Sequence, residues 1–155
     1  MKNSAAALIA TVFGCGRVPR APGTAGSVAA VAAAWLLSAR AGWAPYHFAL
    51  ASAALLPLAV WSAGVVGRAG KVADPPKVVI DELLGQWLTI AGASRLSWKS
   101  MLAAFILFRA FDVWKPFPVR SLESLPGGFG VVADDMMAGI YGAVVLFLAG
   151  CFNFY

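Results

Sequence analysis

Two pairs of adjacent carboxylates are the residues of this sequence most suited to chemistry. Asp81-Glu82 and Asp134-Asp135 each stand directly before a hydrophobic stretch. Together they offer the hard oxygen ligands that Mg²⁺ prefers, with water and phosphate oxygens completing an octahedral shell. Each pair could instead cap the positive N-terminus of a helix. One carboxylate is enough for a cap, so two pairs in one small chain favour a magnesium site.

A polar stripe supports this interpretation for the first pair. Gly85, Gln86 and Thr89 follow Asp81 and Glu82 at a spacing that keeps all five residues on one face of a helix. The remaining faces of this helix are apolar. A carboxylate on a membrane helix costs about 3 kcal/mol on insertion scales, and such residues usually have a function.

A second set of charges could bind the phosphate of a substrate. Arg109, Asp112 and Lys115 are spaced i, i+3 and i+6, just before Pro116. An ion pair between Arg109 and Asp112 within one helix explains those two residues equally well. The functional interpretation has Arg109 or Lys115 holding phosphate oxygens, with Asp112 near the metal.

The segment Pro22–Ser27 leads into a helix and is a weaker candidate for anion binding. Its glycines would let backbone N–H groups approach a phosphate at the positive helix end, with Thr24, Gly26 and Ser27 as the contacting residues. The default interpretation is an ordinary cap by Thr24 or Ser27.

The elements that must position these residues are membrane helices. The chain has 155 residues, of which 61% are hydrophobic and 12% charged, with a mean hydropathy of +0.78. A soluble domain carries about twice that charged fraction. We therefore expect one all-α domain over residues 1–155, a compact membrane bundle of about five embedded helices, two of them short. The predicted spans are Ala41–Gly67, Met136–Tyr155, Gly26–Ala39 extended back to about Ala21, and the short segments 83–94 and 100–108.

The charges divide unevenly between the two ends of such a bundle. With five crossings and a cytoplasmic N-terminus, Arg40, Arg95 and Lys99 lie outside, and nine basic residues lie inside, which obeys the positive-inside tendency. The nine are Lys2, Arg17, Arg20, Arg68, Lys71, Lys77, Arg109, Lys115 and Arg120. The same arrangement places all seven acidic residues on the cytoplasmic side, although acidic residues hardly influence topology. They are Asp74, Asp81, Glu82, Asp112, Glu123, Asp134 and Asp135.

Several function classes do not fit the residues present. No basic run with interleaved aromatics indicates a nucleic-acid partner. Cys15 and Cys151 lack the spacing of a zinc site or a disulfide framework, and the lone His47 cannot supply a pair of catalytic histidines. The sequence also lacks a D-x-D motif and a P-loop. The remaining route to phosphate chemistry is metal-assisted attack on a phosphomonoester by water or by an aspartate carboxylate.

Two other kinds of membrane protein are alternatives. A non-enzymatic ion-binding or transport module would use the carboxylates as an ion path and should carry acids at mid-membrane depth. None falls inside the two long predicted spans, which counts against this alternative. A lipid phosphotransferase with a CDP-linked donor would need the spaced pattern D-G-x2-A-R…D-x3-D, which is missing.

Four blocks in the same order resemble the phosphatidylglycerophosphatase A family, the magnesium-dependent bacterial lipid phosphatases. The similarity extends over about residues 14 to 145, nearly the whole chain. The blocks are Ala21–Ser27 (APGTAGS), Val79–Gly85 (VIDELLG), Phe108–Pro118 (FRAFDVWKPFP), and Gly127–Gly130 (GGFG) followed by Asp134-Asp135 and Ala138-Gly139.

The resemblance implies hydrolysis of phosphatidylglycerol phosphate, an anionic phospholipid, to phosphatidylglycerol and inorganic phosphate in the bacterial inner membrane, with the site facing the cytoplasm. It strengthens the Mg²⁺ interpretation of the two acidic pairs, adds Asp74 as a metal ligand, and supports Asp112, Arg109 and Lys115 as site residues. Arg17 and Arg20 depart from the family, in which smaller residues are familiar. Glu123 is interpreted as an ordinary loop residue, and the sequence leaves the oligomeric state open.

Overall fold

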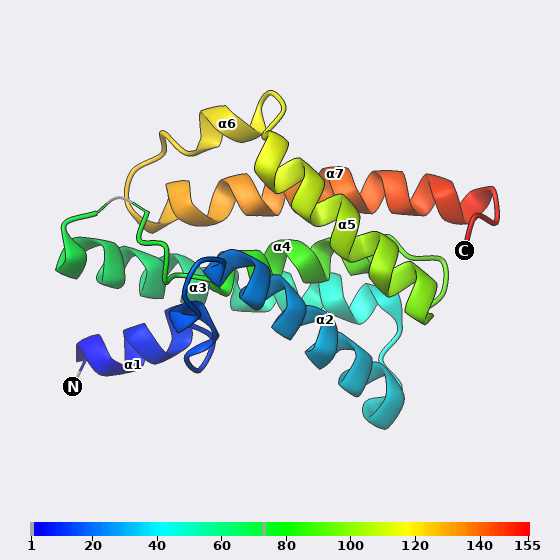
Figure 1. Ribbon diagram of the computed structural model, residues 1–155, viewed down its shortest axis with the longest axis horizontal. Helices are drawn as coiled ribbons and strands as arrows, with labels where there is room; N and C mark the ends of the chain where they lie inside the picture. The colour runs from blue at the N-terminus through cyan, green and yellow to red at the C-terminus, as the bar shows by residue number, and fades with distance from the viewer. Residues whose placement is uncertain (1, 73) are drawn as a thin grey trace.

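The described part of the chain, residues 2–72 and 74–155 of a computed structural model, folds into helices and connecting loops without a strand (Figure 1). This confirms the all-α prediction. In chain order the elements are α1 (Lys2–Ala10), the 3₁₀ turn η1 (Cys15–Arg17), α2 (Pro22–Ala41), α3 (Pro45–Gly70), α4 (Ile80–Ala91), α5 (Trp98–Trp114), α6 (Val119–Leu122) and α7 (Gly128–Cys151).

Three of the described helices, α2, α3 and α7, are long and apolar enough to cross a membrane. They correspond to the three longest predicted spans. The helices α4, with 12 residues, and α5, with 17, overlap the two short predicted segments and are shorter than a typical span of about 20 residues. That these two are also embedded in the membrane stays a prediction.

The start of α7 differs from the sequence prediction. The predicted span began at Met136, with Asp134 and Asp135 at the helix start. The helix instead begins at Gly128, after Gly127 turns the chain with a positive φ of 64°. The two aspartates therefore lie about 10 Å along the axis from the first residue. Capping of the α7 N-terminus cannot account for them, because that effect is confined to the first turn.

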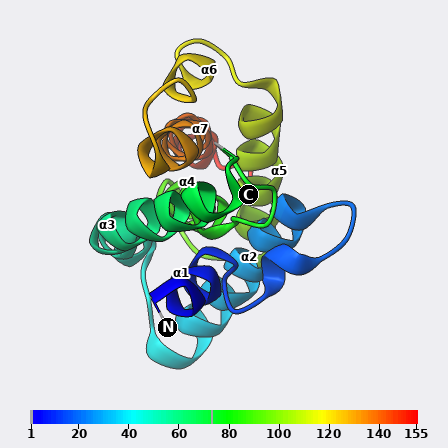
Figure 2. The same ribbon diagram turned by 90° about the vertical axis from the view of Figure 1, so that its left-hand side faces the viewer.

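The centre of the bundle is α4, which packs against α7, α3, α2 and α5 (Figure 2). The contact with α7 is close because glycines meet across it. A Cβ at Gly139 would lie 2.5 Å from the Gly85 carbonyl oxygen, and one at Gly142 would lie 2.8 Å from the Thr89 side chain. The Thr89 hydroxyl donates to the carbonyl oxygens of Gly85, at 3.0 Å, and Gly139, at 3.2 Å. Small residues on α7 thus let its backbone lie directly against α4.

We expect Gly139→Ala to destabilise the protein by about 1–3 kcal/mol, because the added methyl group would push α7 away from the α4 backbone. Gly70→Ala is the matched control, since a Cβ at that position on α3 meets no atom within 4 Å. Thermal unfolding of both variants in detergent measures the difference. Equal melting temperatures would contradict the proposed closeness of the α4–α7 contact.

The charged residues separate between the two ends of the bundle as predicted. At one end α3 and α5 finish and α2, α4 and α7 begin, so that the seven acidic residues gather there. Arg40, Arg95 and Lys99 belong to the opposite end, where the Arg95 guanidinium donates to the Tyr155 carbonyl oxygen at 3.0 Å. The side chain of Lys2, counted above with the cytoplasmic residues, lies outside the described part of the structure.

Candidate metal and phosphate site

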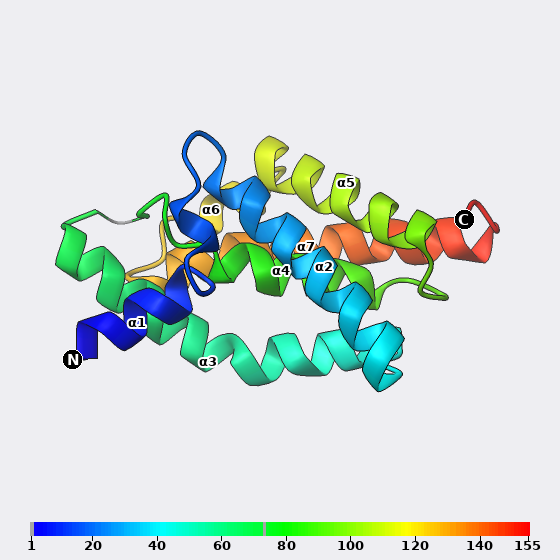
Figure 3. The same ribbon diagram turned by 60° about the horizontal axis from the view of Figure 1, so that its bottom comes forward.

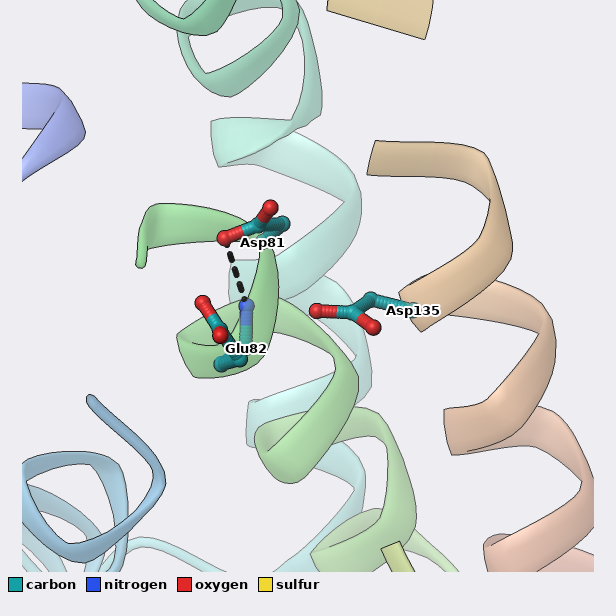
Figure 4. A group of neighbouring side chains, drawn as sticks. All are labelled: Asp81, Glu82 and Asp135. Carbon is teal, nitrogen blue, oxygen red and sulfur yellow. Dashed lines mark hydrogen bonds between the residues drawn. The ribbon is translucent and has the colours of Figure 1, made fainter. Parts of the chain in front are cut away.

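Three carboxylates from two helices converge at the acidic end of the bundle. Asp81 and Glu82 lie in the first turn of α4, and Asp135 reaches toward them from α7 (Figure 4). One oxygen of each lies within 4.8 Å of the others. Asp81 and Asp135 are only 5% and 4% exposed. Burying like charges so close together is costly unless a cation or protons compensate them.

The arrangement of these three groups fits a divalent cation. Opposite oxygen ligands of an octahedral Mg²⁺ lie about 4.2 Å apart, so small side-chain movements would close the group around one ion. Glu82 Oε2 is also buried and has no hydrogen-bond partner among the described residues. Buried polar atoms are almost always satisfied, which indicates that this oxygen faces a ligand. Asp81 Oδ1 also accepts a hydrogen bond from the Glu82 N–H at 3.0 Å.

The residues of the polar stripe on α4 have different surroundings. Gly85 and Thr89 are used for packing against α7, as described above. Gln86 lies one turn beyond Glu82, is fully buried, and has neither amide atom hydrogen-bonded within the described structure. An unsatisfied buried amide costs about 1–3 kcal/mol. Gln86 therefore joins Glu82 as a second buried polar group without a protein partner on this helix.

Arg109 and Asp112 form the ion pair that sequence spacing allowed. Their nitrogen and oxygen atoms lie 2.5 Å apart on the last turns of α5. The charge of Asp112 also acts on Glu82 and Asp135, which makes it a neighbour of the three-carboxylate group. The pair is mostly buried, with Arg109 and Asp112 side chains 23% and 13% exposed. Arg109 can therefore pair with Asp112 and still bind a phosphate, because the ion pair lies beside the three carboxylates.

The start of α2 meets these residues through Gly23. A Cβ at Gly23 would collide with Glu82 Oε1 and lie 3.4 Å from an Arg109 nitrogen. The expected cap by Thr24 or Ser27 is wrong, because the N-cap is Ala21 and no side chain caps this helix. The Ser27 hydroxyl instead donates to the Gly23 carbonyl oxygen at 3.1 Å.

The remaining residues of this segment have different surroundings. Gly26 packs against Val79, where a Cβ would lie 2.8 Å from the Val79 side chain. Thr24 is half-buried in the first turn of α2, which is the positive end of the helix. Of the three residues predicted to contact phosphate, Thr24 is therefore the one that stays free to do so.

Lys115 binds Asp134, whereas the adjacent Asp135 belongs to the three-carboxylate group. Its ammonium donates to Asp134 Oδ2 at 2.7 Å and to the Glu123 carboxylate. Partial burial lowers the pKa of Lys115, but the hydrogen bonds to Asp134 and Glu123 outweigh this and hold the pKa above its ordinary value. Glu123, interpreted from the sequence as an ordinary loop residue, is thus a partner of Lys115. The sequence predicts that Asp134 binds the metal together with Asp81, Glu82 and Asp135. In the structure Asp134 instead pairs with Lys115.

Asp74 is the remaining carboxylate predicted to bind the metal. It lines a cavity of about 310 Å³ together with Glu123 and Asp134, whose Oδ1 is buried and unpaired among the described residues. Partial desolvation raises the pKa of the exposed Asp74, and the Lys115 ammonium opposes this. The structure therefore does not bring Asp74 into the group formed by Asp81, Glu82 and Asp135.

Comparison with known proteins gives a consistent result. The family model described as phosphatidylglycerophosphatase A matches residues 8–150. A protein of Escherichia coli K12 named phosphatidylglycerophosphatase A is 33% identical over 92% of this chain and 82% of its own length. One of the same name from Haemophilus influenzae Rd is 38% identical over 90% of this chain and 85% of its own. A Bacteroides thetaiotaomicron protein named provisionally as a phosphatidylinositol-3-phosphatase is 39% identical over 92% and 91%. No solved structure gives a significant match.

Proposed function

Because the chain belongs to the phosphatidylglycerophosphatase A family, we propose that it removes the terminal phosphate of phosphatidylglycerol phosphate within a membrane. Family membership makes the chain a phosphatase, and it decides against the alternative of an ion-binding or transport module. The absence of acids from the long predicted spans does not count against that module, because Asp134 and Asp135 do lie inside a long apolar helix. The observation that carries the proposal is the buried group of Asp81, Glu82 and Asp135.

Asp81, Glu82 and Asp135 would hold Mg²⁺, with Asp112 beside them. A bound Mg²⁺ supplies charge neutralisation at the phosphate and lowers the pKa of a water molecule. The protein contributes the oxygen ligands, their burial and their fixed spacing on α4 and α7. Neither Asp134 nor Asp74 belongs to the three-carboxylate group. In this proposal Asp134 holds Lys115 in place, and Asp74 lines the cavity next to that ion pair.

Arg109 and the first turn of α2 would bind the phosphate. The guanidinium offers several donors in a planar arrangement that suits phosphate oxygens. The start of α2 adds the partial positive charge of the helix end, next to Arg109 and Glu82 at Gly23. Lys115 would contribute a second positive charge from its position between Asp134 and Glu123. These groups neutralise charge that develops on the phosphate oxygens during hydrolysis.

The orientation in the membrane follows from the charges at the two ends of the bundle. Eight of the nine basic residues assigned to the cytoplasmic side have described side chains, and all eight belong to the same end as the acidic site. The positive-inside tendency then directs this end to the cytoplasm. For a bacterial lipid phosphatase this corresponds to the inner membrane, in agreement with the bacterial sources of its relatives.

Phosphate release by the purified protein in detergent tests the substrate assignment. Phosphatidylglycerol phosphate should be hydrolysed with a kcat/KM at least about tenfold above that of phosphatidylinositol 3-phosphate, which the name of one relative suggests as the second candidate. A higher kcat/KM for phosphatidylinositol 3-phosphate would instead identify the inositol lipid as the substrate. Hydrolysis of neither lipid, by protein that is folded as judged by circular dichroism, would contradict the proposed function.

A further inference from the structure

An apolar groove on the outside of the bundle runs between α2 and α5. Its volume is about 710 Å³, within the range of about 300–1,000 Å³ that small-ligand sites have. Its walls include Val28, Val31 and Trp35 from α2 and Trp98, Leu102 and Phe105 from α5. Four of these six side chains, Val28, Trp35, Trp98 and Leu102, are at least half exposed. The groove is therefore open to the outside of the bundle.

The walls of this groove are continuous with the proposed phosphate site. On α2, the spacing i, i+4, i+7 and i+11 puts one face through Thr24, Val28, Val31 and Trp35. On α5, the same spacing in the reverse direction puts one face through Arg109, Phe105, Leu102 and Trp98. Each face thus begins with a candidate phosphate-binding residue and goes on as a wall of the groove.

The two helices bring these faces together in the required order. They run in opposite directions, closest where α2 begins and α5 ends and diverging from there (Figure 3), and Gly23 at the start of α2 lies against Arg109 near the end of α5. From Arg109 to Trp98 the α5 axis extends about 16 Å at 1.5 Å per residue. One leaflet of a bilayer has a hydrocarbon thickness of about 15 Å. The groove therefore reaches from the phosphate site through about one leaflet.

We propose that this groove binds one acyl chain of the phospholipid substrate while the terminal phosphate lies at Arg109 and the start of α2. The inference rests on the proposed function. Lipid tails fill any apolar surface in a bilayer, so apolarity alone would not identify the occupant. What identifies it is that both walls lead to groups that bind phosphate. In this lipid the phosphoglycerol headgroup and the second glycerol separate the terminal phosphate from the acyl chains, so with that phosphate at Arg109 the chains begin farther along the helices, where the groove lies.

Ala32→Trp tests the proposal, because Ala32 is an exposed residue of the groove wall and an indole there fills the groove without entering the core. We expect kcat/KM for phosphatidylglycerol phosphate with two long acyl chains to fall at least about tenfold, since a displaced chain displaces the phosphate with it. For the deacylated headgroup, glycerophosphoglycerol phosphate, kcat/KM should stay within about twofold of the unmodified protein.

Ala54→Trp is the matched control, an exposed alanine on α3 that does not line the groove, and it should change neither value. Leu102→Trp blocks the groove from the α5 side and should reproduce the effect of Ala32→Trp. The proposal is wrong if both groove variants keep full activity on the long-chain lipid, or if they lose activity equally on both substrates. If the unmodified protein hydrolyses neither substrate, the proposed function itself fails and this inference falls with it.

Discussion

Replacing Asp135 with asparagine is expected to lower kcat about a thousandfold, equivalent to about 4 kcal/mol of transition-state stabilisation. The substitution keeps the shape of the side chain and removes one of three negative charges that lie within 4.8 Å of one another. The same change should leave the melting temperature equal or higher, because Asp135 is 4% exposed and its burial beside like charges is costly. Phosphate release and thermal unfolding of the purified variant measure both effects.

Glu123→Gln is the control for this prediction. Glu123 is a carboxylate at the same end of the bundle, but its side chain is 47% exposed and its partner is Lys115. Loss of such a pair changes free energies by about 1 kcal/mol or less, so activity should stay within about fivefold. Asp135→Asn with near-normal kcat, or with a loss no larger than that of Glu123→Gln, would contradict the proposed metal-binding role of the three carboxylates.

Replacing Arg109 with glutamine is expected to lower kcat/KM about a hundredfold, the usual effect of removing one positive group that stabilises a developing oxyanion. It should also destabilise the protein by about 1–3 kcal/mol, because Asp112, whose side chain is 13% exposed, would lose its partner. Steady-state kinetics on phosphatidylglycerol phosphate and thermal unfolding measure the two effects separately.

The double variant Arg109→Gln with Asp112→Asn distinguishes phosphate binding from simple ion pairing. Removing the second charge should recover most of the lost melting temperature, since no unpaired buried charge remains. Activity should stay low, because the guanidinium that would hold the phosphate is still absent. Recovery of activity together with stability would show that Arg109 serves only to neutralise Asp112.

The membrane helices and the grouping of the acidic residues could be predicted from the sequence because both depend on composition and order. Apolar stretches define the long helices, and alternating crossings return every acidic segment to the same end. The start of α7 does not follow from the sequence, because charged residues usually limit an apolar span, whereas Asp134 and Asp135 are buried inside the helix.

The division of labour between Asp134 and Asp135 could not be predicted from their positions. Adjacent residues on a helix point about 100° apart, so one of them faces α4 while the other faces Lys115. Only the packing of α7 against α4 decides which is which. The pairing of Lys115 with Glu123 was missed for a similar reason, since the loop between α5 and α7 has no periodicity that would fix its path.

The dependence of phosphate release on Mg²⁺ tests the central claim most directly. Purified protein, freed of divalent cations by a chelator and supplied with phosphatidylglycerol phosphate in mixed micelles, should be inactive and should regain activity as Mg²⁺ is added. Asp135→Asn should require a higher Mg²⁺ concentration or remain inactive. Full activity in excess chelator would contradict the proposal that Asp81, Glu82 and Asp135 hold a metal required for hydrolysis.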